Sequence, residues 1–289
     1  MLALVALLAA LSTGLYTPAQ TLIPPPPAFG VLLRYDPPLG QVARYRVSLN
    51  VEGQQISLGE RLPVAWKAEA EVTEEVVAKG ADGSFWLRTS AKVSRLSGGN
   101  GMFANGAAAE WPEVRLHLSQ TGEVLESAQA GVAGASDARE RALAALITES
   151  NPLVLPTEPV GPGDTWEVGT DGARQRSRLL LVEGEGDSRI ARISTVATWP
   201  LAVDEIVSAL GLETHLTGEA RQTSETELLL ATGTVCRQTG RTHLVTRSRV
   251  TLSLPDGNKV FSMKSDLSVA FDVLLVSVDG RPVARRQSG

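Results

Sequence analysis

Long runs of apolar residues at every second position constrain the fold of this 289-residue chain more than any other feature. The clearest run lies in residues 260–278, where one parity holds Phe261, Met263, Leu267, Val269, Phe271, Val273 and Leu275. A period of two is that of a β-strand with one buried and one solvated face. Strands of this length suit a large curved antiparallel sheet or half-barrel better than a compact sandwich. We therefore expect a mainly β (α+β) protein with one or two short helices.

The same alternation predicts individual strands. Val64, Trp66, Ala68, Ala70 and Val72 alternate with mostly polar residues, and Phe85, Leu87, Thr89, Ala91 and Val93 continue the pattern after a turn at 81–83. The two runs are expected to form a long antiparallel hairpin. Further strands are expected near residues 42–51, 114–118, 124–127, 176–183, 189–199, 216–230 and 235–254. The carboxylates of the first hairpin, Glu69, Glu71, Glu74 and Glu75, are expected to form a solvated strand face.

Helical signals are few. Residues 136–149 combine an N-cap serine with apolar side chains on one face, which predicts the main helix. A second, short helix is predicted at Val203 to Leu210, where apolar side chains share one face. Gly99 to Ala104 matches a G-x-G-x-x-A fingerprint, but the Asn105-Gly106 pair that follows would break the helix which such a site requires. We interpret residues 97–109 as a hairpin loop.

The stretch from Leu153 to Trp166 reads L-V-L-P-T-E-P-V-G-P-G-D-T-W and separates two β-rich regions. Its prolines exclude a helix or a central strand, because proline lacks the N–H and fixes φ. We call this stretch the clasp. Gly163-Asp164 is expected to turn the chain into a new strand, in which Trp166 should be buried against the helix at 136–149.

The ends of the chain indicate its organisation. Residues 1–19 are interpreted as a signal peptide because Met1 to Leu15 form an apolar run of h-region length; a buried first helix or an uncleaved anchor are the alternatives. Residues 20–34 form a proline-rich linker, residues 35–279 one β-rich domain, and residues 280–289 a tail. Similar turn motifs in residues 35–152 and 153–279 indicate either two duplicated halves or repeated use of the same turn residues.

Composition argues against several classes of function. A net charge of -5 and a pI near 5.4 give no general attraction for nucleic acid. The single cysteine, Cys236, excludes an internal disulfide and is expected to be a buried small hydrophobe. His117, His215 and His243 stand at no metal-ligand spacing and are expected at the surface. We assign no catalytic, cofactor-binding or metal residue and expect no cofactor.

The apolar leader, the alternating strands and the motif L-P-x-x-P-V-x-x-G-D-T-W at Leu155 to Trp166 resemble a group of exported bacterial β-rich proteins, similar in style to the LolA and LprG-type lipoprotein and lipid carriers. That resemblance implies an open half-barrel whose concave apolar face is closed by helices and holds an acyl chain. The apolar leader, the strand lengths and the lack of catalytic motifs in the sequence predict a periplasmic or extracellular envelope protein that binds a lipid, another hydrophobic ligand or a partner protein without catalysis. A scaffolding protein with a filled core is the alternative, and a hydrolase is the third class.

Overall fold

A single antiparallel sheet forms the body of the protein in a computed structural model, which describes residues 30–57, 59–98, 113–129, 153–170, 172–207, 212–254 and 257–283. Its strands are β1 (Val42–Ser57), β2 (Glu60–Lys79), β3 (Phe85–Gly98), β4 (Val114–Leu118), β5 (Val124–Gln129), β6 (Thr165–Thr170), β7 (Ala173–Glu183), β8 (Ile190–Val207), β9 (Leu212–Leu229), β10 (Thr234–Leu254), β11 (Gly257–Val278) and β12 (Arg281–Pro282). A 3-10 turn, Gly186–Ser188, is the one helical element of the described residues.

The strands follow the order β5-β4-β3-β2-β1-β11-β10-β9-β8-β7-β6, with β12 pairing only with β11. Neighbours in this order are nearly all connected by hairpins, but β1 pairs with β11 from the far end of the chain. One continuous sheet therefore includes strands from both predicted halves. In the described residues the outermost strands, β5 and β6, do not pair with each other, so the sheet stays open.

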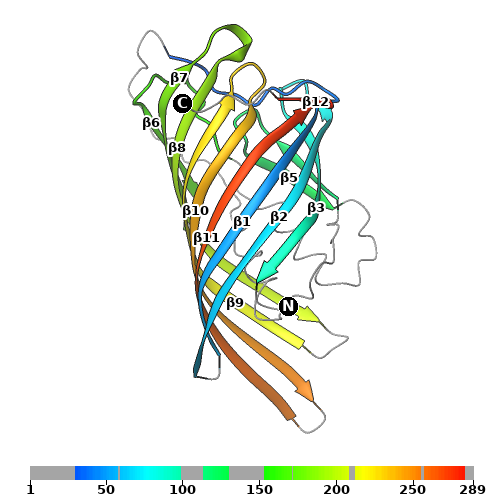
Figure 1. The fold of residues 1–289 in the computed structure, drawn as a ribbon, viewed down its shortest axis with the longest axis vertical. Coiled ribbons are helices and arrows are strands. Elements are labelled where there is room, and N and C mark those ends of the chain that lie inside the picture. The colour runs from blue at the N-terminus through cyan, green and yellow to red at the C-terminus, as the bar shows by residue number, and fades with distance from the viewer. Residues whose placement is uncertain are drawn as a thin grey trace.

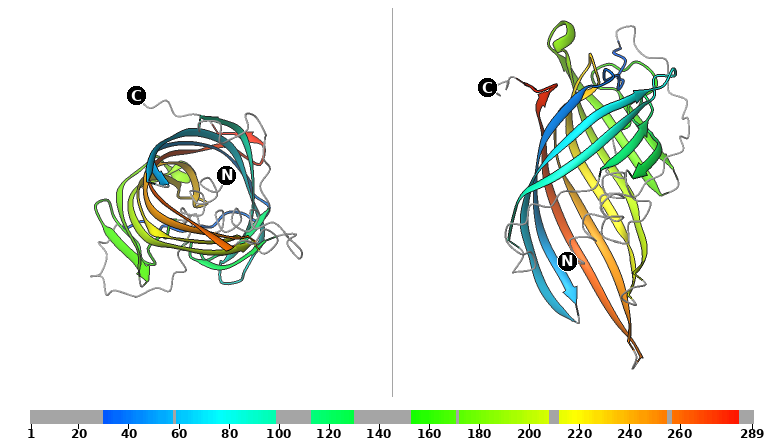
Figure 2. Two further views of the ribbon diagram at one scale, coloured as in Figure 1. Left: turned by 90° about the horizontal axis from the view of Figure 1, so that it is seen from below. Right: turned by 90° about the vertical axis from the view of Figure 1, so that its right-hand side faces the viewer.

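The sheet twists and curls around its long axis, as Figures 1 and 2 show. Such curvature gives it a concave and a convex face, and the strict alternation of the strands assigns residues to each. On β10, Thr242, Leu244 and Thr246 are buried on the concave face, whereas Arg241 and His243 are exposed on the convex one. Ion pairs on the convex face, such as Arg237 with Asp272, stabilise it only modestly because they are solvated.

The concave face holds the main core. One row of apolar side chains crosses the sheet from β2 to β8, including Trp66, Val51, Leu267, Leu244 and Trp199. These residues stand side by side in the strand register: Val51 faces Trp66, and Leu244 faces Leu267. Burial of such side chains contributes roughly 1.5 to 3 kcal/mol each. The row therefore holds the central strands in their curved arrangement.

The clasp connects the two edges of the open sheet at one end. On one side, the Leu155 N–H donates to the carbonyl of Thr121 in the β4–β5 turn, at 2.8 Å. On the other, the clasp runs directly into the edge strand β6, where Trp166 is 3% exposed. The indole Nε1 of Trp166 donates to the Val154 carbonyl at 2.9 Å, and Gln175 bonds the same peptide group. The clasp thus joins edges that no strand pairing connects.

Several expectations about secondary structure and burial are confirmed, and one predicted helix is wrong. The hairpin of β2 and β3 and the long strands after residue 170 are present, and Trp166 is buried. The predicted helix at Val203 to Leu210 is wrong as far as Val207: residues 203–207 continue β8 and pair with β9, with Val203 opposite Leu216. An adjacent long strand offered those residues a full ladder of hydrogen bonds, which outweighs a weak helical pattern. The signal peptide, the residues 97–109 beyond Gly98, and the helix at 136–149 lie outside the described residues.

Candidate functional site

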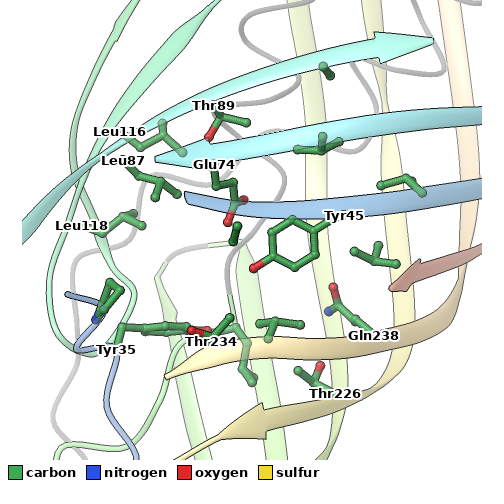
Figure 3. Close-up of a pocket in the computed structure, with 18 of the residues that line it drawn as sticks. Tyr35, Tyr45, Glu74, Leu87, Thr89, Leu116, Leu118, Thr226, Thr234 and Gln238 are labelled. Atoms are coloured by element: carbon green, nitrogen blue, oxygen red, sulfur yellow. The ribbon is translucent and has the colours of Figure 1, made fainter. Parts of the chain in front are cut away.

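A cavity of about 400 Å³ lies on the concave face, near the end of the sheet that carries the clasp. Its walls come from the inward parity of β1, β2, β3, β4, β9, β10 and β11, together with residues 35–37 and Leu153. Figure 3 shows 18 of the lining residues around a common space, with Glu74, Leu87 and Thr89 from one group of strands and Thr226, Thr234 and Gln238 from another. The volume falls within the range of small-molecule sites.

The lining is mostly apolar. Its apolar members are Pro37, Ala43, Val47, Leu49, Ala70, Val72, Val76, Phe85, Leu87, Ala91, Leu116, Leu118, Leu153, Val235, Val269, Phe271 and Val273. Polar side chains are fewer, and among the described residues that line the cavity Glu74 is the one acidic residue, with no lysine, arginine or histidine. A predominantly apolar cavity with a few polar groups is the usual composition of a ligand site.

Glu74 is placed in the cavity by the alternation of β2. Val72 and Val76, two residues to either side, line the same cavity, whereas Thr73 and Glu75 point to the other face. The Glu75 carboxylate forms an ion pair with Arg88 there. The Glu74 side chain is half-buried, and the part that is not covered by protein faces the cavity. Our expectation that Glu74 belongs to a solvated strand face is therefore wrong, while Glu69 and Glu71 are exposed as expected.

The Glu74 carboxyl accepts a hydrogen bond from the hydroxyl of Tyr45, which comes from the neighbouring strand β1. Burial raises the pKa of Glu74 to about 7, although the Tyr45 hydrogen bond opposes this shift by stabilising the carboxylate. Burial also raises the pKa of Tyr45, and the Glu74 charge raises it further. Both phenol and carboxyl therefore keep protons that exposed groups would lose, and Glu74 changes charge near neutral pH.

Residues 30–41 close one end of the cavity. The Tyr35 N–H donates to Gln120 in the β4–β5 turn, and the Asp36 N–H donates to Thr232 in the β9–β10 turn, at 2.8 and 3.0 Å. The Tyr35 hydroxyl donates to the carbonyl of Leu153 in the clasp, at 2.8 Å. Burial raises the pKa of Tyr35, and the Glu74 charge adds to the effect. This segment and the clasp together form one wall of the site.

His117 belongs to a different constellation on the convex face. Its Nε2 lies 2.9 Å from the Ser84 Oγ, and that hydroxyl donates to the Asp82 carboxylate at 2.6 Å. Hydrogen bonds from Ser84 lower the pKa of Asp82, so the carboxylate is ionised. In a catalytic triad the histidine accepts the serine proton and the carboxylate orients the histidine. Here the Ser84 hydroxyl donates its proton to Asp82, so His117 does not accept that proton and Asp82 does not orient the histidine. His117 stacks on Trp86 with ring centroids 4.8 Å apart.

The other sequence candidates also lie away from the cavity lining. His243 pairs with Asp266 at 2.7 Å on the exposed face of β10, and His215 is exposed on β9. Cys236 is half-buried and packs with Ala43 and Tyr45. Within the described ranges, no three histidine, cysteine, aspartate or glutamate residues are grouped so as to hold a metal ion. The described residues also include no helix that is long and apolar enough to span a membrane.

Comparisons with known proteins give no family. No protein-family model matches the chain, and no curated protein sequence matches it. Among solved structures, one on lipid–protein interactions in lipovitellin is similar over 86% of this chain and 26% of that chain, with a TM-score of 0.39 and 12% identity. A mutant porin of Rh. blastica is similar over 81% of this chain and 99% of its own, with a TM-score of 0.25 and 7% identity.

An outer membrane channel from Pseudomonas putida F1 is similar over 88% of this chain and all of its own, with a TM-score of 0.23 and 9% identity. This chain spans about a quarter of the length of lipovitellin. All three TM-scores are below 0.5, so the similarities carry no functional implication for this chain. Any function has to rest on the residues of the cavity.

Proposed function

We propose that this protein is a non-catalytic cell-envelope protein that binds a hydrophobic ligand in the cavity on the concave face of its sheet. The observation that carries the proposal is the cavity itself, whose walls are apolar side chains of many different strands. Protein interiors usually pack as densely as organic crystals, so apolar side chains that face open space have lost contacts they could have made. A hydrophobic ligand would restore those contacts.

The curved sheet supports the proposal. Long strands such as β1, β2 and β11 contribute inward side chains to both the core row and the cavity, so the site is built on rigid elements. Tyr35 and Leu153, which close one end, are joined to each other by a hydrogen bond. A ligand would therefore enter a largely preformed site, which reduces the conformational cost of binding.

The export part of the proposal rests on the sequence alone. The apolar run of Met1 to Leu15 supports secretion to the periplasm or the extracellular space. Cell fractionation and amino-terminal sequencing of the mature protein test it. Cleavage after Ala19 is the expected result. Intact protein in the cytosol with Met1 retained would contradict export, and intact protein in the membrane fraction would indicate an anchor.

A pair of matched variants tests ligand binding. Ala70 faces the cavity from β2, and Ala65 is exposed on the opposite face of the same strand. Ala70→Trp should fill the cavity and reduce binding of Nile red, a neutral hydrophobic dye, whereas Ala65→Trp should leave binding unchanged. Mass spectrometry of organic extracts should also find lipid in the purified wild-type protein. A wild-type protein that binds no dye and yields no lipid would favour the scaffold with a filled core.

A further inference from the structure

The polar groups of the cavity indicate which hydrophobic ligands it selects. Glu74 is the one charged group among the described lining residues, and those residues include no lysine, arginine or histidine. A ligand with a terminal carboxylate or phosphate would therefore place its negative charge beside a carboxyl group with no cation in the described lining. Like charges at short range disfavour each other strongly in a poorly solvated site.

A buried hydroxyl group without a hydrogen-bond partner, that of Thr89, lies next to Glu74. Thr89 on β3 is directly opposite Glu74 on β2 in the strand register and lines the same cavity. Its side chain is 5% exposed, and its hydroxyl has no hydrogen-bond partner. Residues opposite each other in antiparallel strands have Cβ atoms about 5 Å apart. A buried hydroxyl without a partner costs about 1 to 3 kcal/mol, and a polar ligand group beside Glu74 would give the Thr89 hydroxyl a partner. Thr226, which lines the cavity from β9, has a buried hydroxyl of the same kind.

From these two observations we infer that the site takes a cationic amphiphile: an apolar chain or ring system that fills the cavity and a protonated amine that binds the Glu74 carboxylate. This inference rests on the proposed function. An ammonium group carries three donors and no acceptor. Glu74, the Thr89 hydroxyl and the oxygen of Tyr45 present acceptors on neighbouring strands, and Figure 3 shows all three side chains at the cavity. The amine would also supply the counterion that Glu74 lacks.

Amine binding should depend on the charge of Glu74. The titratable groups that face it from the elements around it are Tyr45 on β1 and Tyr35 on the end segment, with Cys236 on β10 beside Tyr45. Burial raises the pKa of Glu74 to about 7, so the carboxylate forms as the pH rises through neutrality. A primary alkylamine stays protonated until about pH 10, like lysine. Amine affinity should therefore increase from pH 5.5 to pH 8.5.

Three ten-carbon probes of different charge test the inference: decylamine, decanol and decanoate. Decylamine and decanoate are used below their critical micelle concentrations and decanol below its solubility limit. Their affinities for the full chain are measured by calorimetry and by displacement of Nile red at pH 5.5 and pH 8.5. Decylamine should bind best at pH 8.5, and decanol should be independent of pH. Decanoate should bind worst at pH 8.5, where Glu74 is ionised. If only the ionised carboxyl binds the amine, the decylamine affinity should rise about thirtyfold over this range.

The variants separate the site from general charge effects. Glu74→Gln should reduce decylamine affinity to that of decanol and abolish its pH dependence. Glu75→Gln removes the adjacent carboxylate on the convex face and should leave the decylamine affinity and its pH dependence unchanged. Thr89→Val should weaken decylamine more than decanol, and it keeps the inference testable if Glu74→Gln folds poorly. Binding of none of the probes would overturn the proposed function. Equal affinities of the three probes at pH 8.5, or tightest binding of decanoate at that pH, would overturn this inference while leaving hydrophobic binding in place.

Discussion

The hydroxyl of Tyr45 on β1 donates a hydrogen bond to the carboxyl of Glu74 on β2, within a cavity whose other described lining residues carry no charge. The two strands are neighbours, and Tyr45 lies opposite Val72, two residues before Glu74. The bond is therefore a diagonal contact across one strand pair. Burial of this pair sets the pKa of Glu74 near the pH at which most proteins work.

The first prediction concerns stability against pH. Because the folded pKa of Glu74, about 7, is above the value of 4.5 that is usual for an exposed glutamate, the folded state holds a proton that the unfolded state releases. This stabilisation is fully present below about pH 4.5 and is lost as the pH rises through 7. Urea unfolding should show that wild type loses about 2 to 3 kcal/mol relative to Glu74→Gln between pH 5 and pH 8.

The matched variant for that experiment is Glu75→Gln, which removes a carboxylate from the opposite face of the same strand and controls for the loss of one negative charge. Wild-type and Glu74→Gln curves that stay parallel over the whole range would show that Glu74 titrates as an ordinary surface carboxylate.

The second prediction isolates the Tyr45 hydroxyl. Tyr45→Phe removes a donor that favours the charged form of Glu74, so the pKa of Glu74 should rise further above 7. Carbon-13 NMR of glutamate carboxyls, with the Glu74 signal assigned from Glu74→Gln, measures the change directly. Tyr35→Phe is the control, because the Tyr35 hydroxyl donates to Leu153. A lower pKa in Tyr45→Phe would mean that the hydroxyl does not donate to the carboxylate.

The third prediction concerns the clasp. Trp166 packs with Leu33, Leu155 and Leu179, and its indole N–H satisfies the Val154 carbonyl. Trp166→Ala should therefore cost about 3 to 5 kcal/mol of unfolding free energy, as large aromatic deletions in cores do. Trp86→Ala is the matched control, because Trp86 is only half-buried on the convex face. A loss of less than about 1 kcal/mol for Trp166→Ala, measured by urea unfolding, would show that the clasp does not hold the sheet edges together.

The sequence predicted the sheet because alternation is a local signal. Each long strand keeps its parity over many residues, and the parity assigned to Leu267 and Val269 is the buried one in the structure. The same alternation also predicts the face on which Glu74 lies. Glu74 is the next residue of the apolar parity after Val64, Trp66, Ala68, Ala70 and Val72. Glu69, Glu71 and Glu75 have the opposite parity, so Glu74 does not belong to the solvated face that the other three glutamates share. A carboxylate on the apolar parity of a strand is thus a usable signal for a site.

The rest of the site could not be predicted from local pattern. The cavity is formed by residues far apart in sequence, such as Tyr35, Thr89 and Gln238, and the curvature of the whole sheet determines which of them face each other. The pairing of β1 with β11 joins strands from opposite ends of the chain, and the alternation within each strand does not identify its partner. The prolines of the clasp mark it in the sequence, but its link to the β4–β5 turn through Leu155 and Thr121 is a tertiary contact.

The last prediction concerns the closure of the cavity by residues 30–41. Gly233, in the β9–β10 turn, has φ of 68°, and a Cβ there would clash with the Arg34 carbonyl oxygen and the Tyr35 backbone. Gly40 has a similar φ of 78° but faces open space. The left-handed backbone alone costs a residue other than glycine about 1 to 2 kcal/mol, so Gly40→Ala should lose that amount of unfolding free energy. Gly233→Ala should lose at least about 1 kcal/mol more, because the end segment has to move.

That movement should also affect the ligand site, because Tyr35 and Gly233 both line the cavity. Nile red should bind Gly233→Ala more weakly than Gly40→Ala under conditions where both variants are fully folded by circular dichroism. Comparing two alanines with nearly the same backbone strain separates the steric effect on the end segment from the conformational cost. Equal stability losses and equal dye affinities in the two variants would show that the close contact between the β9–β10 turn and residues 34–35 does not hold the cavity closed.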